Sequence, residues 1–143
     1  MLKLVIFDFF ATLFDAQTQL LYPEAIPLIE WVKGKGLKTA LFTNSTGWGM
    51  FFTEREKNLF DDTLLADIKG PHELDVILKH LEVKPKETVV VGDSLNREIA
   101  AGKTLGTRTI WLGGTRSDDP LHPIASDLTA ARSILEQWLK IKP

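Results

Sequence analysis

The chain contains no cysteine, so it has neither a disulfide framework nor a thiolate metal site. It also has no excess of positive charge, because 17 Lys and Arg are set against 19 Asp and Glu, for a formal net charge of −2. Nonspecific affinity for nucleic acid comes from clustered Lys and Arg. We therefore expect no nucleic-acid partner.

Long hydrophobic runs are missing as well. No apolar stretch reaches the roughly 20 residues that a membrane-spanning helix needs. The apolar stretch at the amino terminus lacks the basic leader and the small-residue cleavage pattern of a signal peptide. These absences predict a cytoplasmic protein with no membrane partner.

The composition is that of an ordinary globular protein. The 143 residues are 44% hydrophobic and 25% charged, without internal repeats, low-complexity tracts or linkers. A chain of this length is long enough for one hydrophobic core. We expect a single domain over residues 1–143.

The first stretch of the chain combines a strongly apolar run with one carboxylate. LKLVIFDFFATLFD, residues 2–15, places Asp8 between Phe7 and Phe9. A carboxylate in apolar surroundings is costly unless it is paired or binds a metal. The pattern predicts a buried strand that ends in a functional acid.

Further apolar runs of strand length alternate with segments of helical spacing. Lys69-Gly70-Pro71 and Gly106 mark element ends. Such alternation is typical of a parallel sheet with helices on both faces. It predicts an α/β fold, doubly wound and Rossmann-like, as a three-layer sandwich with a five-stranded sheet. After the first strand, strands are expected at 38–42, 63–66, 88–91 and 108–112, and helices at 22–34, 48–59, 71–81, 97–105 and 128–138, with a loop at 113–123.

Polar residues follow four of the predicted strands. Taken alone, each has an ordinary structural explanation, such as a turn, a surface lysine or a helix cap. In doubly wound sheets, however, the carboxyl ends of the strands meet at the ligand site. The residues brought together there would be Asp8, Thr43, Asn44, Lys69, Asp93 and Ser94.

These side chains together have the chemistry of a phosphate site. Two carboxylates, Asp8 and Asp93, would hold a hard divalent cation. The hydroxyl of Thr43 and the amide of Asn44 would bond to phosphoryl oxygens, and Lys69 would offset the negative charge.

The four stretches resemble, in order and position, the motifs of the haloacid dehalogenase-like hydrolase superfamily. The first motif is matched by DFFATL, the second by Thr43-Asn44, the third by Lys69, and the fourth by VVVGDSLNREIAAGKTLG. The resemblance extends from Leu2 to about Leu112. The fourth match is the most specific, because a second acid, Glu98, follows the glycine, acid and serine.

The resemblance implies a mechanism and a cofactor. Asp8 would be the nucleophile that forms an aspartyl-phosphate from a phosphorylated substrate, with Lys69 as the second catalytic residue. Mg²⁺ would be bound by Asp8, Asp93 and the backbone carbonyl of Phe10. Phosphate would be bound by Thr43, Asn44 and Lys69, with Thr12, Ser94 and Glu98 in supporting roles.

Phe10 departs from the family pattern. Most phosphatases of the family have a second aspartate at this position, which protonates the leaving oxygen. Such acid–base assistance contributes roughly 10²- to 10⁴-fold in rate. An active enzyme is therefore expected to prefer a good leaving group, such as an acyl or aryl phosphate. The alternative is a catalytically impaired protein that binds phosphate or serves as a regulatory module.

A second alternative is a metal-independent 2-haloacid dehalogenase, because those enzymes resemble this chain in having an aromatic residue at the position of Phe10. Two features count against it. The acid of the fourth motif is retained as Asp93, and the segment before Thr43 is too short for a helical cap. Without a cap the site would be open to a large substrate, or would be closed by a partner chain in a homo-oligomer. Trp48, Phe51 and Phe52 either form such a contact surface or pack in the core.

Overall fold

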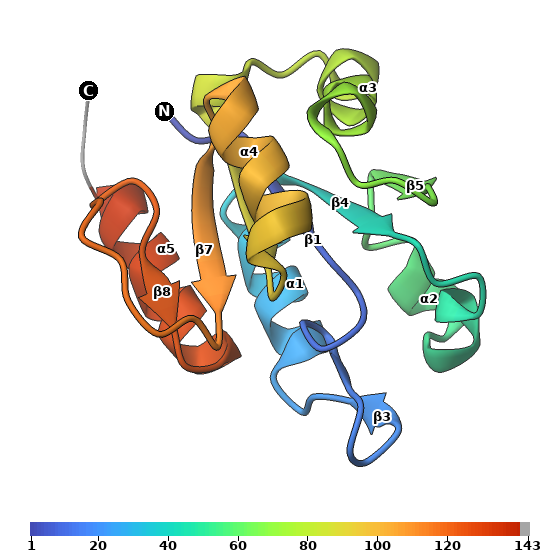
Figure 1. The fold of residues 1–143 in the computed structure, drawn as a ribbon. Helices are drawn as coiled ribbons and strands as arrows, with labels where there is room; N and C mark the ends of the chain where they lie inside the picture. The colour runs from blue at the N-terminus through green and yellow to red at the C-terminus, as the bar shows by residue number, and fades with distance from the viewer. Residues whose placement is uncertain (141–143) are drawn as a thin grey trace.

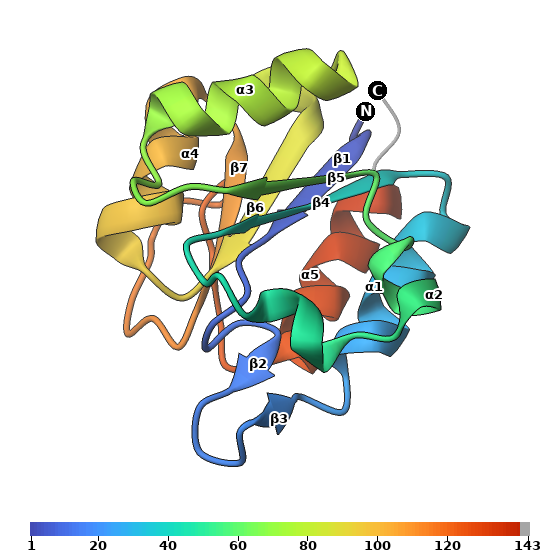
Figure 2. The same cartoon turned by 90° about the vertical axis from the view of Figure 1, so that its right-hand side faces the viewer.

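The centre of the molecule is a six-stranded sheet in which all neighbouring strands are parallel. The computed structural model describes residues 1–140. Figures 1 and 2 show the sheet between two layers of helices. The strands, in their order across the sheet, are β5 (Asp62–Leu65), β4 (Lys38–Thr43), β1 (Leu4–Phe7), β6 (Thr88–Gly92), β7 (Arg108–Leu112) and β8 (Ile124–Ala125).

Strand β1 is buried on both faces of the sheet. Its alternate side chains enter different clusters: Val5 and Phe7 pack with helices α1 (Ala25–Gly34) and α5 (Leu128–Lys140). Leu4 and Ile6 pack with α3 (Pro71–Leu81) and α4 (Ala100–Leu105). This two-sided core explains why β1 is uniformly apolar. The predicted doubly wound, three-layer α/β fold is confirmed.

The order of the strands shows where a crevice is expected at the edge of the sheet. From β1 the chain builds β4 and β5 on one side and then crosses to β6, β7 and β8 on the other side. A crevice forms at the carboxyl ends of the strands where the direction of winding changes. The loops after β1, β4 and β6 meet there.

The sheet has one strand more than the sequence predicted. Residues Ile124–Ala125 form β8 beside β7, directly after the predicted loop. Two residues are too few to give a strand signal in sequence, because periodicity needs several alternations to be visible. The pairing arises from tertiary contact with Trp111 and Leu112.

The segment predicted as one helix over residues 48–59 is divided. A 3₁₀ turn, η1 (Trp48–Phe51), is followed by extended backbone at Phe52 and a short helix, α2 (Glu54–Lys57). Thr53 starts the second helix, because its hydroxyl accepts the Glu56 N–H while the Glu56 carboxylate accepts the Thr53 N–H. Phe52 is buried and Trp48 and Phe51 pack against the same core.

The helix predicted over residues 97–105 begins earlier and less regularly. A π-type turn, η3 (Leu95–Ile99), precedes α4. The remaining elements are a small hairpin of β2 (Phe14–Asp15) and β3 (Leu20–Leu21), and a 3₁₀ turn, η2 (Pro85–Glu87). Within residues 1–140, only the hairpin and α1 lie between β1 and β4, and only η1 and α2 lie between β4 and β5. None of the helices in this range combines the length and hydropathy that crossing a membrane requires.

Candidate active site

Asp8 lies immediately after β1 and is held by backbone and side-chain contacts. Its N–H donates to the Val91 carbonyl at 3.0 Å, which continues the pairing of β1 with β6. The chain then turns sharply at Ala11, whose φ of 60° is left-handed. The turn brings back Thr12, whose hydroxyl donates to Asp8 Oδ2 at 3.1 Å. Asp8 is consequently 4% exposed and has a fixed orientation.

Lys69 reaches Asp8 from the loop between β5 and α3. Its ammonium group donates to Asp8 Oδ1 and, at 3.0 Å, to Glu98 Oε1. It also lies 5.5 Å from the centroid of the Phe42 ring. Only 5% of Lys69 is exposed, so this lysine belongs to the interior of the site.

Glu98 is positioned by the π-type turn that follows β6. It is 1% exposed, and its Oε2 accepts the Ser94 N–H at 2.7 Å. Gly92 leaves room for it, since a Cβ at residue 92 would lie 2.4 Å from Glu98 Cγ. The Asp93 carbonyl accepts a hydrogen bond from Trp111 Nε1 at 3.1 Å, which ties the same loop to β7.

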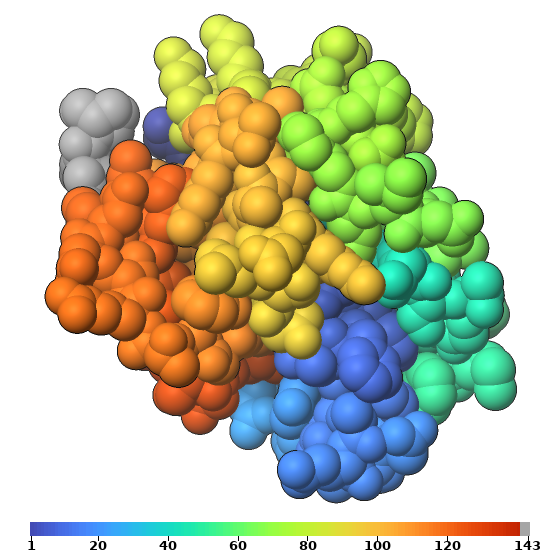
Figure 3. All heavy atoms as spheres, in the orientation of Figure 1, coloured from blue at the N-terminus to red at the C-terminus, as the bar shows by residue number. Residues whose placement is uncertain are grey.

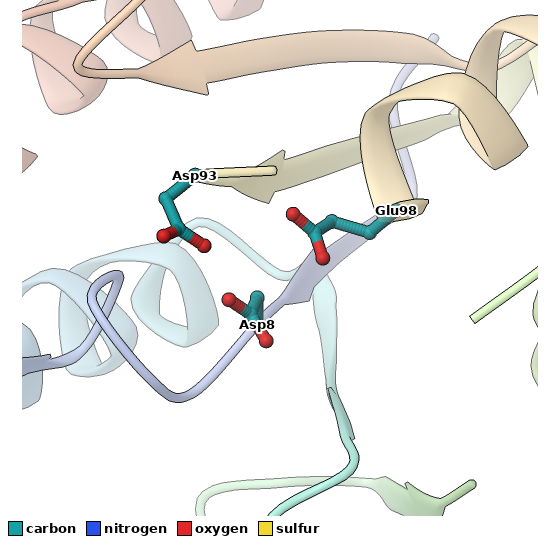
Figure 4. A group of neighbouring side chains, drawn as sticks. All are labelled: Asp8, Asp93 and Glu98. Carbon is teal, nitrogen blue, oxygen red and sulfur yellow. The ribbon is translucent and has the colours of Figure 1, made fainter. Parts of the chain in front are cut away.

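Three carboxylates converge above the ends of β1 and β6, as Figure 4 shows. One ligand oxygen from each of Asp8, Asp93 and Glu98 lies within 4.8 Å of the others. Burial raises the pKa of Asp8 to about 6, against the opposing effect of Lys69. Burial and the charge of Asp8 likewise raise the pKa of Glu98.

The donor set fits a hard divalent cation. Three acids are accompanied by only one inner cation, Lys69, and carboxylate oxygens are the preferred ligands of Mg²⁺. The Phe10 carbonyl accepts no hydrogen bond from any residue between 1 and 140, so its oxygen remains free to serve as a ligand.

These residues belong to a cleft of about 480 Å³. Its buried inner end, Asp8, Lys69 and Glu98, is called the floor below. Its exposed outer edge, Phe10, Asn44 and Arg97, is called the rim. In Figure 3 the blue segment after β1 lies at the surface between the yellow segment after β6 and the teal segment after β4. The lining residues are Asp8, Phe10, Asn44, Ser45, Lys69, Asp93, Ser94, Arg97 and Glu98.

The residues of the predicted second motif take different positions. Thr43 is fully buried at the end of β4, and its hydroxyl accepts the Ser45 N–H at 3.0 Å. Asn44 faces the cleft, and Ser45 does so beside it. The structure thus brings Asn44, Lys69, Asp93, Ser94 and Glu98 to the cleft with Asp8, while Thr43 supports the loop from below.

Phe10 occupies the rim. Half of its surface is exposed, and its ring leans on Phe14, with 5.9 Å between the ring centroids. Phe14 is itself buried against Phe9 and Phe51. Phe10 therefore presents an apolar surface at the mouth of the cleft, and its ring is held in place by packing against Phe14.

Two lining residues were not identified from the sequence. Ser45 belongs to the Thr43–Thr46 cluster, in which only Thr43 and Asn44 match the second motif, so no pattern in the sequence assigned a role to Ser45. Arg97 directly precedes Glu98. In the regular helix predicted from residue 97, two adjacent residues were not expected to point toward the same cleft. The π-type turn does so: Glu98 enters the floor and Arg97 the rim.

Comparison with known proteins gives consistent results. The sequence model of the haloacid dehalogenase-like hydrolases matches residues 2–106. A glyceraldehyde 3-phosphate phosphatase from Pyrococcus furiosus is 28% identical over 88 residues, which are 56% of this chain and 37% of that protein. A phosphoserine phosphatase from Thermus thermophilus is 29% identical over 113 residues, 70% of this chain and 44% of that protein. The chain thus spans less than half the length of either phosphatase.

A solved structure extends the comparison to the whole fold. A 2-haloacid dehalogenase from Pseudomonas syringae superposes with a TM-score of 0.78 at 17% identity, over 96% of this chain and 100% of that one. At this identity the likeness is one of fold.

Proposed function

This chain belongs to the haloacid dehalogenase-like hydrolase family, and from that premise we propose that it is a Mg²⁺-dependent phosphatase. The reaction would proceed through an aspartyl-phosphate on Asp8. The substrate class is a phosphorylated compound with a good leaving group, such as an acyl or aryl phosphate. Its two curated relatives are named as phosphatases, which supports phosphoryl transfer as the chemistry.

One observation carries the proposal: a buried carboxylate is held between a lysine and two further acids. Asp8 contacts Lys69, and oxygens of Asp93 and Glu98 lie within 4.8 Å of it. Burying this much charge is unfavourable, and such clusters of ionisable groups are concentrated at functional sites. The arrangement gives a fixed nucleophile, with one cationic group, that of Lys69, beside the position of an incoming phosphoryl group.

In the first step, an Asp8 carboxylate oxygen attacks phosphorus. The bond from phosphorus to the leaving oxygen breaks, and the electron pair stays on that oxygen. Thr12 and Lys69 orient the nucleophile through their bonds to its two oxygens. In the second step, water attacks the aspartyl-phosphate, Asp8 is released as a carboxylate, and both water protons are carried by the phosphate product.

Asp8, Asp93 and the Phe10 carbonyl would hold Mg²⁺, which when bound lowers the repulsion between the nucleophile and the phosphoryl anion. Lys69 offsets part of the same negative charge from inside the protein. Asn44 and Ser45 face the cleft and supply an amide and a hydroxyl to phosphoryl oxygens, above a loop that Thr43 stabilises.

Phe10 sets the range of substrates. A phenylalanine cannot protonate a departing oxygen, so an alkoxide leaving group would depart slowly. Carboxylates and aryloxides are stable enough to leave without a proton. The open mouth allows the remainder of such a substrate to extend into solvent.

Phosphate release from acetyl phosphate or p-nitrophenyl phosphate tests the proposal. We expect release that requires Mg²⁺ and is abolished in Asp8→Asn. Asp75→Asn is the matched control, because Asp75 is on α3 and pairs with the exposed Lys79. Release no faster than a buffer blank at high enzyme concentration would overturn the proposal.

The two alternatives give different results in the same assays. A phosphate-binding module would be stabilised against heat by phosphate with Mg²⁺ but would show no turnover. A dehalogenase would release halide from 2-chloropropionate with or without metal.

A further inference from the structure

Arg97 is the cation on the rim of the cleft, and its charge is not engaged by any residue between 1 and 140. Arg55, Arg116 and Arg132 each pair with a carboxylate, and Arg108 lies over the Trp138 ring. Arg97 has neither kind of partner among residues 1–140, although it borders a cleft that contains three acids. Its guanidinium is therefore available to a bound molecule.

The position of Arg97 relative to Asp8 determines which part of that molecule it meets. Phosphoryl transfer requires the attacking and departing oxygens to lie on opposite sides of phosphorus. Asp8 attacks from the floor, so the departing oxygen points outward. The cleft residues on that side are those of the rim, Phe10, Asn44 and Arg97.

We propose that Arg97 is a catalytic residue that stabilises the negative charge on the departing oxygen. This inference rests on the proposed phosphatase function and extends it. Phe10 occupies the position from which a carboxylic acid would donate a proton, and the floor has no free cation because Lys69 is bonded to Asp8 and Glu98. Arg97 would supply charge and hydrogen bonds in place of a proton.

The bond changes require no proton donor. As the oxygen of Asp8 bonds to phosphorus, the departing oxygen takes the electron pair of its own bond and leaves as an aryloxide or carboxylate. An arginine guanidinium stays protonated in proteins, so it stabilises the anion without transferring a proton. Its planar donors also match the two oxygens of a departing carboxylate.

A series of aryl phosphates whose phenols differ in pKa tests the role of Arg97. The measured quantity is the slope of log kcat/KM against the leaving-group pKa, with Mg²⁺ present. In Arg97→Gln the slope should be steeper: about tenfold slower than wild type for phenyl phosphate and nearly equal for dinitrophenyl phosphate. This is below the usual loss for a buried oxyanion donor, since Arg97 is exposed to water.

Conservative variants distinguish electrostatic stabilisation from structural support. Arg97→Lys should recover part of the rate for phenyl phosphate, and added guanidinium ion should partly restore Arg97→Gln. Arg55→Gln is the matched control, because it removes an exposed arginine that pairs with Glu30 on α1, away from the cleft. It should leave the slope as in wild type.

An equal loss of rate across the series, or no loss, in Arg97→Gln would overturn the role of Arg97 while leaving the phosphatase proposal intact. No phosphate release from any substrate by the wild-type protein would overturn both.

Discussion

The floor and the rim of the cleft differ in how their polar groups are used. On the floor, every charged group is bonded to another: Lys69 joins Asp8 to Glu98, and Glu98 also accepts the Ser94 N–H. On the rim, Arg97 has no carboxylate partner within residues 1–140, and Phe10 presents half of its surface to solvent. The floor is organised before a substrate arrives, whereas the rim leaves its groups available for one.

In the proposed mechanism, this difference separates two parts of catalysis. A buried, fully bonded set of charges costs no reorganisation when it meets the phosphoryl group. An exposed edge would then determine which leaving group is stabilised. Changes on the floor should therefore alter stability and activity together, while changes on the rim should alter substrate preference with little effect on folding.

The largest expected effect on stability is that of Lys69→Met on the floor. It leaves Asp8 and Glu98 buried without their cation, and removing one partner of a buried pair costs about 3 to 5 kcal/mol. The loss should increase with pH, because the remaining acids must ionise. Urea unfolding at two pH values measures it, and Lys79→Met, at an exposed lysine, is the control that should stay near wild type. Equal stability of Lys69→Met and wild type at high pH would show that Lys69 does not stabilise the buried acids Asp8 and Glu98.

On the rim, Phe10→Asp should broaden the substrate range. The new carboxylic acid stands where a departing oxygen can be protonated, so the rate on alkyl phosphates should rise by up to about 10²-fold. Leu95→Asp adds an acid on a nearby exposed residue that does not line the cleft, and it should give no gain. A well-folded Phe10→Asp protein with unchanged or lower activity would mean that the rim does not face the leaving group.

Gly92→Ala tests how closely the floor is packed. The added Cβ would lie 2.4 Å from Glu98 Cγ and 2.6 Å from Glu98 Oε2, so Glu98 must move, which disturbs its bonds to Lys69 and to the Ser94 N–H. We expect a loss of about 2 kcal/mol in the free energy of unfolding and a lower kcat. Gly34→Ala, where no atom lies within 4 Å of the new Cβ at the end of α1, should be neutral or slightly stabilising. Similar results for the two variants would contradict tight packing at Glu98.

The smallest expected effect is a gain in stability from Asp8→Asn in metal-free buffer at pH 7. Burial, opposed by Lys69, raises the pKa of Asp8 from 3.8 to about 6, so the folded state binds a proton more tightly than the unfolded state. Between these values stability falls as pH rises, and the full loss is present above pH 6. Removing the charge of Asp8 should recover about 1 kcal/mol of this loss. The recovery is incomplete because the asparagine amide bonds to Lys69 more weakly than the carboxylate does. A thermal melt with EDTA measures this; a lower melting temperature in Asp8→Asn would show that the ionised acid stabilises the fold.

The sequence predicted the fold where signals were local. β1 and β6 are continuous apolar runs followed by an acid, and two-sided burial leaves that pattern in any sequence. It could not predict β8, whose two residues become a strand only by pairing with β7. The division of the 48–59 segment was readable in principle, since Thr53 and Glu56 have the spacing of a capping box.

The candidate site divides in the same way. Asp8 and Lys69 could be identified because they follow predicted strands, and Glu98 because the stretch after β6 resembles the fourth motif of the family. The contribution of Arg97 could not be predicted, because it depends on the π-type turn that directs neighbouring residues to the floor and the rim. Similarly, the orientation of Thr43 toward the Ser45 N–H depends on loop geometry.

The central claim is that Asp8 is a nucleophile at the floor of a phosphoryl-transfer site. Rapid acid quenching of the Mg²⁺-loaded protein with acetyl phosphate, followed by mass spectrometry of the peptide that contains Asp8, tests it directly. We predict a mass increase of one phosphoryl group on that peptide, lost on treatment with hydroxylamine and absent from Asp8→Asn. Phosphate release without this adduct, or an adduct that persists in Asp8→Asn, would contradict the assignment.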